Sequence, residues 1–330
     1  MEIGVNLPWF GGAYGHDLGT NQAYPDWPVW YDSGKVSALL EFIRSFGIWL
    51  VRIWLFEDGE GIDSQLNADN LFLTNLSDLV DRIRSAGIRV YWTLLNANGA
   101  RGKWDRITAR ILTEPEQAQE FVMRALSAVA PVIQDVAWAV DLCNEPEAIV
   151  AGPTGGWTSS GWKWPDLQPP LAVLRQGVAS LLPGVRVSIG SGYHNQRNVA
   201  AGIYDRLNLD LDFYDFHLYT PVTEAFACPA RVEISPHKPI VLGEIGCVIP
   251  EEDRGSEQMW NQSQSCLVSS IERVRELGFE AVFLWYVNDP EAADATGLVF
   301  RGQTGAVLRA LSSPQMFRNS GYPKTRRPLT

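Results

Sequence analysis

Apolar residues follow two different spacings along this chain. In the segments 33–46 and 70–86 they return at every third or fourth position, which is the spacing of an amphipathic helix. Each segment is followed by a short, nearly continuous apolar run, at 49–56 and 89–96, and such runs are typical of parallel strands buried on both faces. The pattern therefore predicts units in which helices and buried strands alternate.

One short pattern marks the passage from helix to strand at three places. Gly47, Gly87 and Gly278 each follow the end of a predicted helix, and each precedes an apolar run. Glycine at that place supplies the positive φ with which helices commonly end. The repetition indicates successive copies of one helix–strand unit.

Eight such units span the chain. Strands are predicted near 3–9, 49–56, 89–96, 136–143, 186–191, 213–218, 240–245 and 281–287. Helices are predicted near 33–46, 70–86, 115–133, 168–182, 196–208, 222–233, 256–277 and 303–311. Strict alternation favours an α/β fold closed into a (β/α)8 TIM barrel, with an open doubly wound sheet as the alternative. No linker separates domains, so residues 1–330 are predicted to form a single domain.

Two long loops, 10–32 and 147–166, follow the first and fourth predicted strands and are rich in Gly and Trp. Both are expected on the C-terminal face of the barrel, where barrel enzymes place their chemistry. Aromatic rings in such loops serve either as lids over the barrel or as platforms on which sugar rings stack. Both interpretations remain open from the sequence.

Charge and composition exclude several function classes. A formal net charge of -11 opposes binding to nucleic acid, and no apolar run is long enough to span a membrane. The few His and Cys residues have no metal-ligand spacing, so no metal and no other cofactor is expected, and a metal-dependent hydrolase or aldolase lacks support. The oligomeric state is not indicated.

The four cysteines do not suggest a disulfide framework. Cys143 and Cys247 lie within predicted apolar strands and are expected to be small buried residues. No signal sequence is visible at the N-terminus, so a cytoplasmic location is expected, or a secreted one if a leader has been trimmed.

Two glutamates stand at strand ends. Glu145 follows Leu-Cys-Asn, and Glu244 follows Leu-Gly, so both point at the barrel mouth, three β/α units apart. One such glutamate alone is compatible with a salt bridge or a helix cap. Two carboxylates held across a pocket are what a retaining glycosidase needs, one to protonate the leaving oxygen and one to attack the anomeric carbon.

Asn144-Glu145-Pro146, together with Glu244 in Gly-Glu-Ile-Gly, resembles clan A of the glycoside hydrolases, most closely the cellulase-like group around family 5. The resemblance implies that Glu145 is the general acid/base and Glu244 the nucleophile. It also implies a set of substrate-binding side chains near the reacting sugar: Arg52, Asn144, His217, Tyr219 and Trp285.

Each of these supporting residues has a structural alternative, as a salt bridge, a core histidine or a packing aromatic. One position departs from the resemblance, because cellulase-like members usually carry a His at the end of the third strand, where this chain has Asn96 and Asn98. Asn96 and the rim residue Trp9 complete the expected substrate-binding set. Glu57 is expected to be a turn residue or a contact to a sugar hydroxyl.

The chemistry sets further expectations for the site. Arg52 and Tyr219 are expected to depress the pKa of Glu244, and Asn144 to donate to the sugar 2-hydroxyl. Adjacent side chains of a regular strand face opposite ways, so Asn144 and Glu145 both reach the site only if the strand is distorted there. Asp141, inside the same strand, is expected to stabilise a polar layer of the barrel.

The sequence thus predicts a retaining β-glycoside hydrolase that acts on β-linked oligosaccharides, polysaccharides or glycosides by double displacement. A transglycosylase with the same residues is one alternative, and a catalytically silent carbohydrate-binding barrel is another. The sugar, its linkage and the choice between internal and terminal cleavage depend on loop shapes that spacing does not define.

Overall fold

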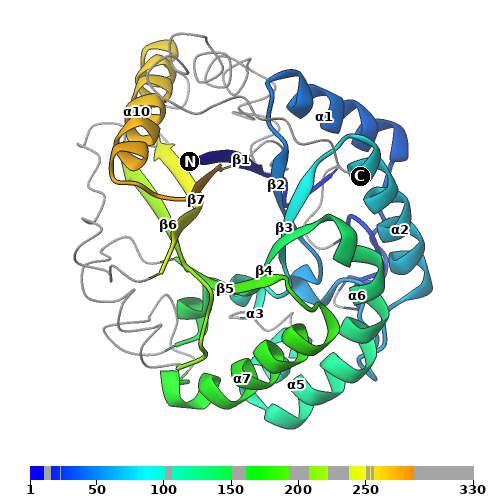
Figure 1. The fold of residues 1–330 in the computed structure, drawn as a ribbon. Coiled ribbons are helices and arrows are strands. Elements are labelled where there is room, and N and C mark those ends of the chain that lie inside the picture. The colour runs from blue at the N-terminus through cyan, green and yellow to red at the C-terminus, as the bar shows by residue number, and fades with distance from the viewer. Residues whose placement is uncertain are drawn as a thin grey trace.

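In the computed structural model, eight parallel strands form one closed barrel in which spatial neighbours follow sequence order (Figure 1). The structure describes residues 1–10, 16–22, 24–100, 106–150, 161–192, 208–221, 238–249, 253 and 256–285. The first strand pairs with the last, with Glu2 opposite Ala281. The predicted (β/α)8 barrel is confirmed and the open sheet is excluded.

The strands lie close to their predicted positions. They are β1 (Glu2–Asn6), β2 (Leu50–Trp54), β3 (Arg89–Thr93), β4 (Ala137–Asn144), β5 (Arg186–Ser191), β6 (Tyr214–Pro221), β7 (Ile240–Val248) and β8 (Ala281–Leu284).

Helices cover the outside of the ring (Figure 1). The longer ones are α1 (Ser33–Ser45), α2 (Asn70–Ser85), α4 (Arg106–Thr113), α5 (Pro115–Phe121), α6 (Ser127–Ile133), α7 (Trp164–Leu181) and α10 (Glu257–Glu276). Short turns are η1 (Glu57–Gly59), α3 (Ala97–Ala100), the π-helical η2 (Val122–Leu126), η3 (Gln134–Val136) and η4 (Pro146–Ile149). The predicted helices 222–233 and 303–311, and residues 196–207 of a third, lie outside the described residues.

Local chemistry explains where the helices begin and end. The Asp32 side chain accepts the backbone N–H groups of Gly34 and Lys35, and a cap of this kind contributes about 1 kcal/mol. The three predicted helix-ending glycines, Gly47, Gly87 and Gly278, have φ values of 77°, 66° and 76°. A Cβ atom would strain each of these positions, so the sequence pattern and the backbone agree.

Two of the predicted helices have other bounds in the structure, and α4 lies where no helix was predicted. The segment 115–133 is not one regular helix but α5, η2 and α6 in succession, and α6 contains Pro131, which has no N–H for the helical ladder. α7 starts at Trp164 rather than near 168, because the backbone N–H of Lys163 donates to the Asp166 side chain at 2.8 Å.

Alternation along the strands separates two apolar layers. The outer layer joins strands to helices through residues such as Val51 and Val90. A smaller cluster fills the barrel interior and consists of Leu50, Tyr91, Ala139, Phe213, Val241, Ala281 and Phe283. Because successive strand residues point to opposite faces, Arg52 and Asp141 follow Leu50 and Ala139 on the inward face. The interior is therefore apolar at one level and charged at the next.

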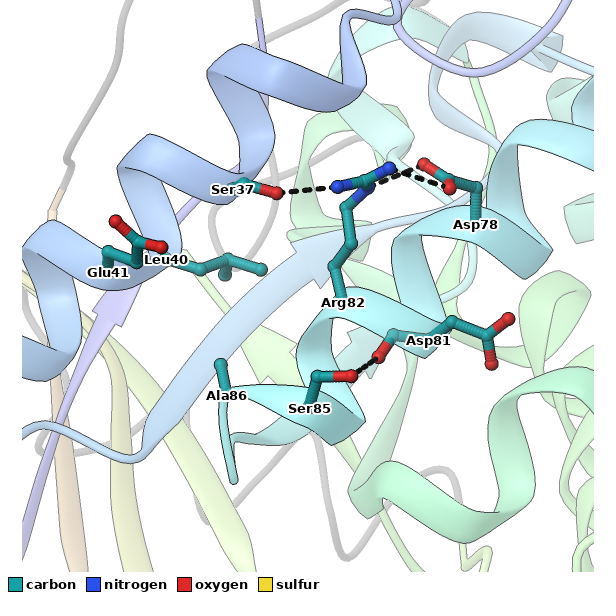
Figure 2. A pocket seen from close by; sticks show the side chains of 8 residues that line it. All are labelled: Ser37, Leu40, Glu41, Asp78, Asp81, Arg82, Ser85 and Ala86. Atoms are coloured by element: carbon teal, nitrogen blue, oxygen red, sulfur yellow. Dashed lines mark hydrogen bonds and ion pairs between the residues drawn. The ribbon is translucent and has the colours of Figure 1, made fainter.

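A polar groove separates α1 from α2 on the outside of the barrel (Figure 2). Arg82 crosses it and donates to Ser37 at 2.6 Å and to Asp78 at 2.7 Å. These contacts tie the neighbouring helices α1 and α2 together. No helix in the described residues has the length and apolar character needed to cross a membrane.

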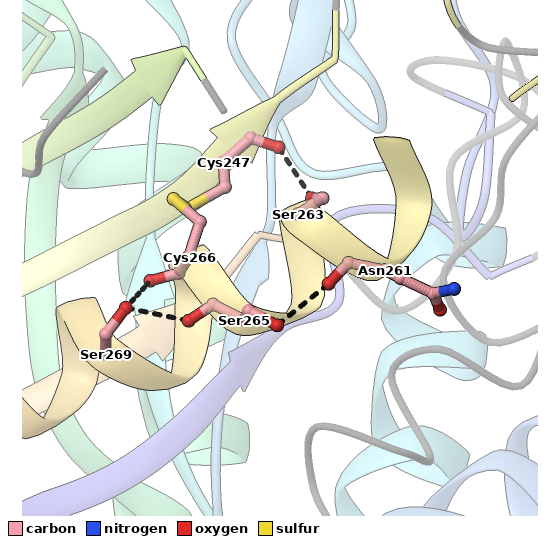
Figure 3. The surroundings of a disulfide bond; sticks show 6 residues. All are labelled: Cys247, Asn261, Ser263, Ser265, Cys266 and Ser269. Carbon is pink, nitrogen blue, oxygen red and sulfur yellow. Dashed lines mark hydrogen bonds between the residues drawn. A yellow bond between two sulfur atoms is a disulfide. The ribbon is translucent and has the colours of Figure 1, made fainter. Parts of the chain in front are cut away.

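The expectation for Cys247 is wrong. Cys247 on β7 is half-buried and forms a disulfide with Cys266 on α10, with 6.2 Å between their Cα atoms (Figure 3). Ser263 of the same helix donates to the Cys247 carbonyl at 2.9 Å. The two cysteines share no recognisable spacing motif, and only the packing of α10 on β7 brings them together. Cys143 is free and buried, as expected.

Reducing the disulfide should lower stability. The bond closes a loop with a sequence separation of 19, and in the chain-entropy view such a loop is worth about 3 kcal/mol of unfolding free energy. Dithiothreitol should therefore lower the Tm of the wild type but not that of a Cys247→Ser, Cys266→Ser double variant, in which the bond is already absent. An unchanged wild-type melting curve under reductant would contradict this expectation.

Candidate active site

The carboxylates of Glu145 and Glu244 meet at the mouth of the barrel. One ligand atom each of Glu145, His217 and Glu244 lie within 4.8 Å of one another, and all three residues are buried. Retaining glycosidases hold their two carboxyl groups about 5–5.5 Å apart, whereas inverting ones need roughly 6.5–9.5 Å to admit a water molecule. The separation therefore suits direct attack by one carboxylate on a shared anomeric carbon.

The predicted distortion at the end of β4 is present. Glu145 has φ 49° and ψ 57°, a left-handed conformation that a non-glycine residue seldom adopts. The pairing of β4 with β5 shifts register between Asp141 and Asn144, and Pro146 then begins η4. This break in the strand lets the adjacent side chains of Asn144 and Glu145 both enter the site.

Among the residues that the structure describes, Asn98 and His217 contact the Glu145 carboxylate. The Asn98 amide Nδ2 donates to Oε2 at 2.5 Å, and His217 Nδ1 lies 2.9 Å from Oε1. Asn98 lies in α3, the short helix that follows β3. The sequence analysis did not assign it to the site. Its position after a strand end was the available signal, but its distance from Glu145 depends on how the barrel closes.

A glycine forms the wall beside Glu145. A Cβ atom on Gly192 would lie 2.5–2.6 Å from atoms of the Glu145 side chain, so no larger residue fits there without a shift. Glu147 anchors this wall by accepting hydrogen bonds from the Ser191 hydroxyl and, at 3.3 Å, from the Gly192 backbone N–H. Burial raises the pKa of Glu147 to about 7.

Arg52 is fully buried beneath the two catalytic candidates. Its guanidinium donates to Glu244 Oε1 at 2.7 Å, Asp141 Oδ2 at 2.7 Å, Asn144 Oδ1 at 2.8 Å and Asn6 Oδ1 at 3.0 Å. Arg52 is thus more than a salt bridge at the barrel bottom, because it joins the polar layer to the site. Asp141 has the structural role expected of it, since it also accepts the Gly190 backbone N–H at 3.0 Å.

The expected depression of the Glu244 pKa is wrong in net direction. Burial raises the pKa of Glu244 above 4.5, although the charges of His217 and Arg52 and the Tyr219 hydrogen bond act to lower it. The Tyr219 hydroxyl donates to Oε2 at 2.5 Å, and His217 Nδ1 lies 3.5 Å from Oε1. Removal of the Glu244 carboxylate from water disfavours its charged form more than these partners favour it.

Aromatic rings line one side of the site. Trp285, directly after β8, lies edge-on to Trp9 at 5.9 Å between ring centroids and near Tyr219 at 6.4 Å. Trp54 completes the cluster at 5.8 Å from both Trp9 and Trp285. Trp9 is buried whereas Trp285 is partly exposed, so Trp285 offers the more accessible face.

The aromatic residues of the two long loops are neither all buried, as lids over the barrel would be, nor all exposed, as platforms for sugar rings would be. Trp27, Trp30 and Trp162 are exposed, whereas Phe10 and Trp164 are buried. Tyr14 and Trp157, which belong to the same loops, lie outside the described residues.

A hydrogen-bonded chain leads away from Asn144. Its Nδ2 donates to Asn96 Oδ1 at 3.1 Å, and Asn96 Nδ2 donates to Glu57 Oε1 at 3.2 Å. The Trp9 indole N–H donates to the other Glu57 oxygen at 2.5 Å. Glu57 is therefore neither a turn residue alone nor an open contact for a sugar hydroxyl.

The cluster of Glu145, His217 and Glu244 is the one group in the described residues with spacing that suits a metal ion. A cation there would stand beside the Arg52 guanidinium, which already occupies Glu244 Oε1. Like charges at this distance repel strongly in a buried site, so the donor set fits an acid–base pair better than a metal centre.

The structure brings every expected site residue to one end of the barrel, where they contact one another directly or through a single shared partner. One such partner, Asn98, was not assigned to the site from sequence, and Glu57 was expected to be a turn residue or a sugar contact rather than a partner of Trp9 and Asn96.

Solved structures share this fold. A β-1,4-mannanase from the sea hare Aplysia kurodai is similar with a TM-score of 0.64 and 19% identity over 95% of this chain and 93% of that chain. The β-mannanase of the blue mussel Mytilus edulis gives 0.66 and 17% over 95% and 92%. A GH5_18 protein from Streptomyces cattleya, in complex with Manβ1-4GlcNAc, gives 0.66 and 14% over 97% and 83%. No family model and no curated relative matches the sequence.

Replacing Arg52 by Met should destabilise the fold by about 3–5 kcal/mol, because Asp141 and Glu244 would remain buried without their cation. Urea unfolding at neutral pH measures the loss, and it should shrink at acidic pH as Glu244, whose pKa is raised by burial, becomes protonated. Arg84→Met is the matched control, because Arg84 pairs with Asp81 at the surface, where such pairs contribute about 0–1 kcal/mol. Equal losses in both variants would contradict the expectation.

Proposed function

We propose that this chain is a retaining β-glycoside hydrolase in which Glu145 is the general acid/base and Glu244 the nucleophile. The observation that carries the proposal is the approach of the two buried carboxylates to within 4.8 Å at the barrel mouth. Similarity to solved β-mannanases supports it, since their fold is the same.

In the first step, a Glu244 oxygen attacks the anomeric carbon while Glu145 gives its proton to the glycosidic oxygen. The bond between that oxygen and the anomeric carbon breaks, and a glycosyl ester of Glu244 forms. Glu244 must be ionised to attack. Arg52 and Tyr219 donate to its two oxygens and stabilise the negative charge that burial disfavours.

In the second step, Glu145 takes a proton from water, and the water oxygen attacks the anomeric carbon and releases Glu244. Loss of the negative charge on Glu244 in the ester favours the change of Glu145 from acid to base. Asn98 and His217 hold the Glu145 carboxylate through both steps. Asn144 has one amide N–H bonded to Asn96, and its second N–H can donate to the sugar 2-hydroxyl.

For the substrate, we propose β-linked sugars that stack on Trp285. Proteins of similar fold include β-mannanases and a protein solved with a mannose-containing disaccharide, so β-1,4-linked manno-oligosaccharides are the first to test, beside gluco-oligosaccharides. Asn96 stands where cellulase-like enzymes usually have His, and this difference bears on which sugar the site accepts.

We also propose that residues 1–330 form one catalytic domain and that it works in an oxidising compartment. The disulfide between Cys247 and Cys266 favours an oxidising compartment over the cytoplasm, because such bonds persist mainly in exported proteins.

Glu244→Gly should abolish turnover of aryl β-glycosides, and azide should restore it. Azide fills the space of the missing carboxylate and attacks from the α face, so the product should be the α-glycosyl azide, identified by NMR. A wild type that binds sugars without turnover would instead indicate a silent binding barrel. Disaccharide products at high donor concentration would indicate a transglycosylase.

Glu145→Ala should reduce kcat/KM by about 10²–10⁴ on substrates with poor leaving groups, and far less on activated aryl glycosides, which need no proton. Azide should now attack the glycosyl ester from the opposite face and give the β-glycosyl azide. Steady-state kinetics over a series of leaving groups measures the effect. An equal loss for all leaving groups would contradict the acid role.

A further inference from the structure

We propose that Glu57 is a positioning residue of the sugar site, which holds Trp9 with one carboxylate oxygen and, through Asn96, the amide of Asn144 with the other. The inference rests on the proposed function and adds a residue that acts through its neighbours rather than on the sugar.

The turn after β2 places Glu57 between the ends of β1 and β3. Asp58 has φ 53°, and the Gly59 backbone N–H returns to the Phe56 carbonyl at 3.2 Å, which makes the turn tight. Only 5% of Glu57 is exposed. Its side chain therefore lies inside the protein, where each oxygen needs a partner.

Both partners of Glu57 are donors. The Trp9 indole N–H, at 2.5 Å, has no acceptor capacity, and Asn96 turns its Nδ2 toward Glu57 at 3.2 Å. A carboxylate offers an acceptor at each end, whereas a glutamine offers only one. The bonding pattern therefore requires an acidic residue at position 57.

The bond to Glu57 sets the orientation of the Asn96 amide. With Nδ2 engaged, Oδ1 points the other way and accepts from Asn144 Nδ2 and from the Asn98 backbone N–H, both at 3.1 Å. These two residues flank the acid/base, because Asn98 donates to Glu145 and Asn144 precedes it. The Asn96 side-chain amide thus holds both Asn98 and Asn144 in place beside Glu145.

The Asn144 amide is fixed at its other end as well. Its Oδ1 accepts from Arg52 at 2.8 Å, so the amide cannot turn over without losing contacts to both Arg52 and Asn96. One N–H of Asn144 remains for the sugar. A change at Glu57 that lets Asn96 turn would remove the support for that orientation.

The cost of this arrangement argues against a purely structural origin. Burial raises the pKa of Glu57 well above 4.5, the charge of Asp58 adds to the effect, and the Trp9 hydrogen bond opposes it. Within the described part of the chain, no Lys or Arg forms an ion pair with Glu57. A buried carboxylate without a cation is expensive and is typical of functional sites.

Glu57→Gln and Glu57→Ala should lower kcat/KM for aryl β-glycosides by about 10- to 100-fold, which corresponds to the loss of one hydrogen bond to a charged group. Glu60→Gln is the matched control. Glu60 is a buried carboxylate on the same loop, but it accepts from the backbone N–H groups of Leu18 and Gly19 and not from site residues. Equal losses in Glu57→Gln and Glu60→Gln would overturn the proposal.

Two further measurements separate positioning from general damage. With 2-deoxy aryl β-glycosides, which lack the hydroxyl that Asn144 would contact, the effect of Glu57→Gln should be smaller, because only the routes through Trp9 and Asn98 remain. An undiminished effect would overturn the route through Asn144. The Trp9 indole proton, assigned by Trp9→Phe, should move upfield in Glu57→Ala. An unmoved signal would overturn the contact itself.

Failure of the proposed function gives a different result. If the wild type turns over no glycoside, affinity for manno-oligosaccharides, measured by calorimetry, replaces kcat/KM. Weaker binding in Glu57→Gln than in Glu60→Gln would still support a positioning role at a sugar site. Unchanged binding in both would overturn that role.

Discussion

The structure depends on one buried cation. Arg52 stands on β2 inside the barrel, with no exposed surface, and lies between Glu244 above it and Asp141 beside it. The charges of these carboxylates raise the pKa of the guanidinium even though burial opposes them. A cation in this place satisfies the polar layer and at the same time stabilises the carboxylate of Glu244, the proposed nucleophile.

The barrel interior is layered around that cation. Below it, the aromatic rings of Tyr91, Phe213 and Phe283 fill the closed end, and the Tyr91 hydroxyl reaches up to Asp215 at 2.6 Å. Above it, Glu145 and Glu244 face the open end. Asp215 in turn accepts the Gly243 backbone N–H at 2.6 Å, directly before Glu244. The apolar cluster, the polar layer and the two carboxylates proposed for catalysis are therefore in continuous contact along the barrel interior.

Backbone strain is present at the proposed acid/base, Glu145. Glu145 adopts a left-handed backbone conformation, its neighbouring wall is a glycine that cannot be larger, and its carboxylate is held from two sides by Asn98 and His217. The disulfide between Cys247 and Cys266 fastens α10 to β7, the strand that also carries Glu244. The left-handed backbone of Glu145 persists because the surrounding contacts over-determine its conformation.

Sequence patterns alone were enough to predict the fold and the two carboxylates at the barrel mouth. Helical spacing, buried apolar runs and glycines such as Gly87 are local patterns, so they predicted the alternating units and, with eight of them, the barrel. Glu145 and Glu244 were found because each ends an apolar strand, and parallel strands end on one face. The need for a distorted β4 followed from the alternation of side chains along a strand.

The partners of these residues depend on contacts between segments that are distant in sequence. Glu57 meets Trp9 and Asn96 at sequence separations of 48 and 39, and Arg52 meets Glu244 at 192, distances over which no periodicity carries information. Burial also reversed the expected direction of the Glu244 pKa, because desolvation depends on the whole fold. Sequence patterns report what a segment prefers locally, whereas hydrogen-bond partners, disulfide pairing and burial arise only when the barrel closes.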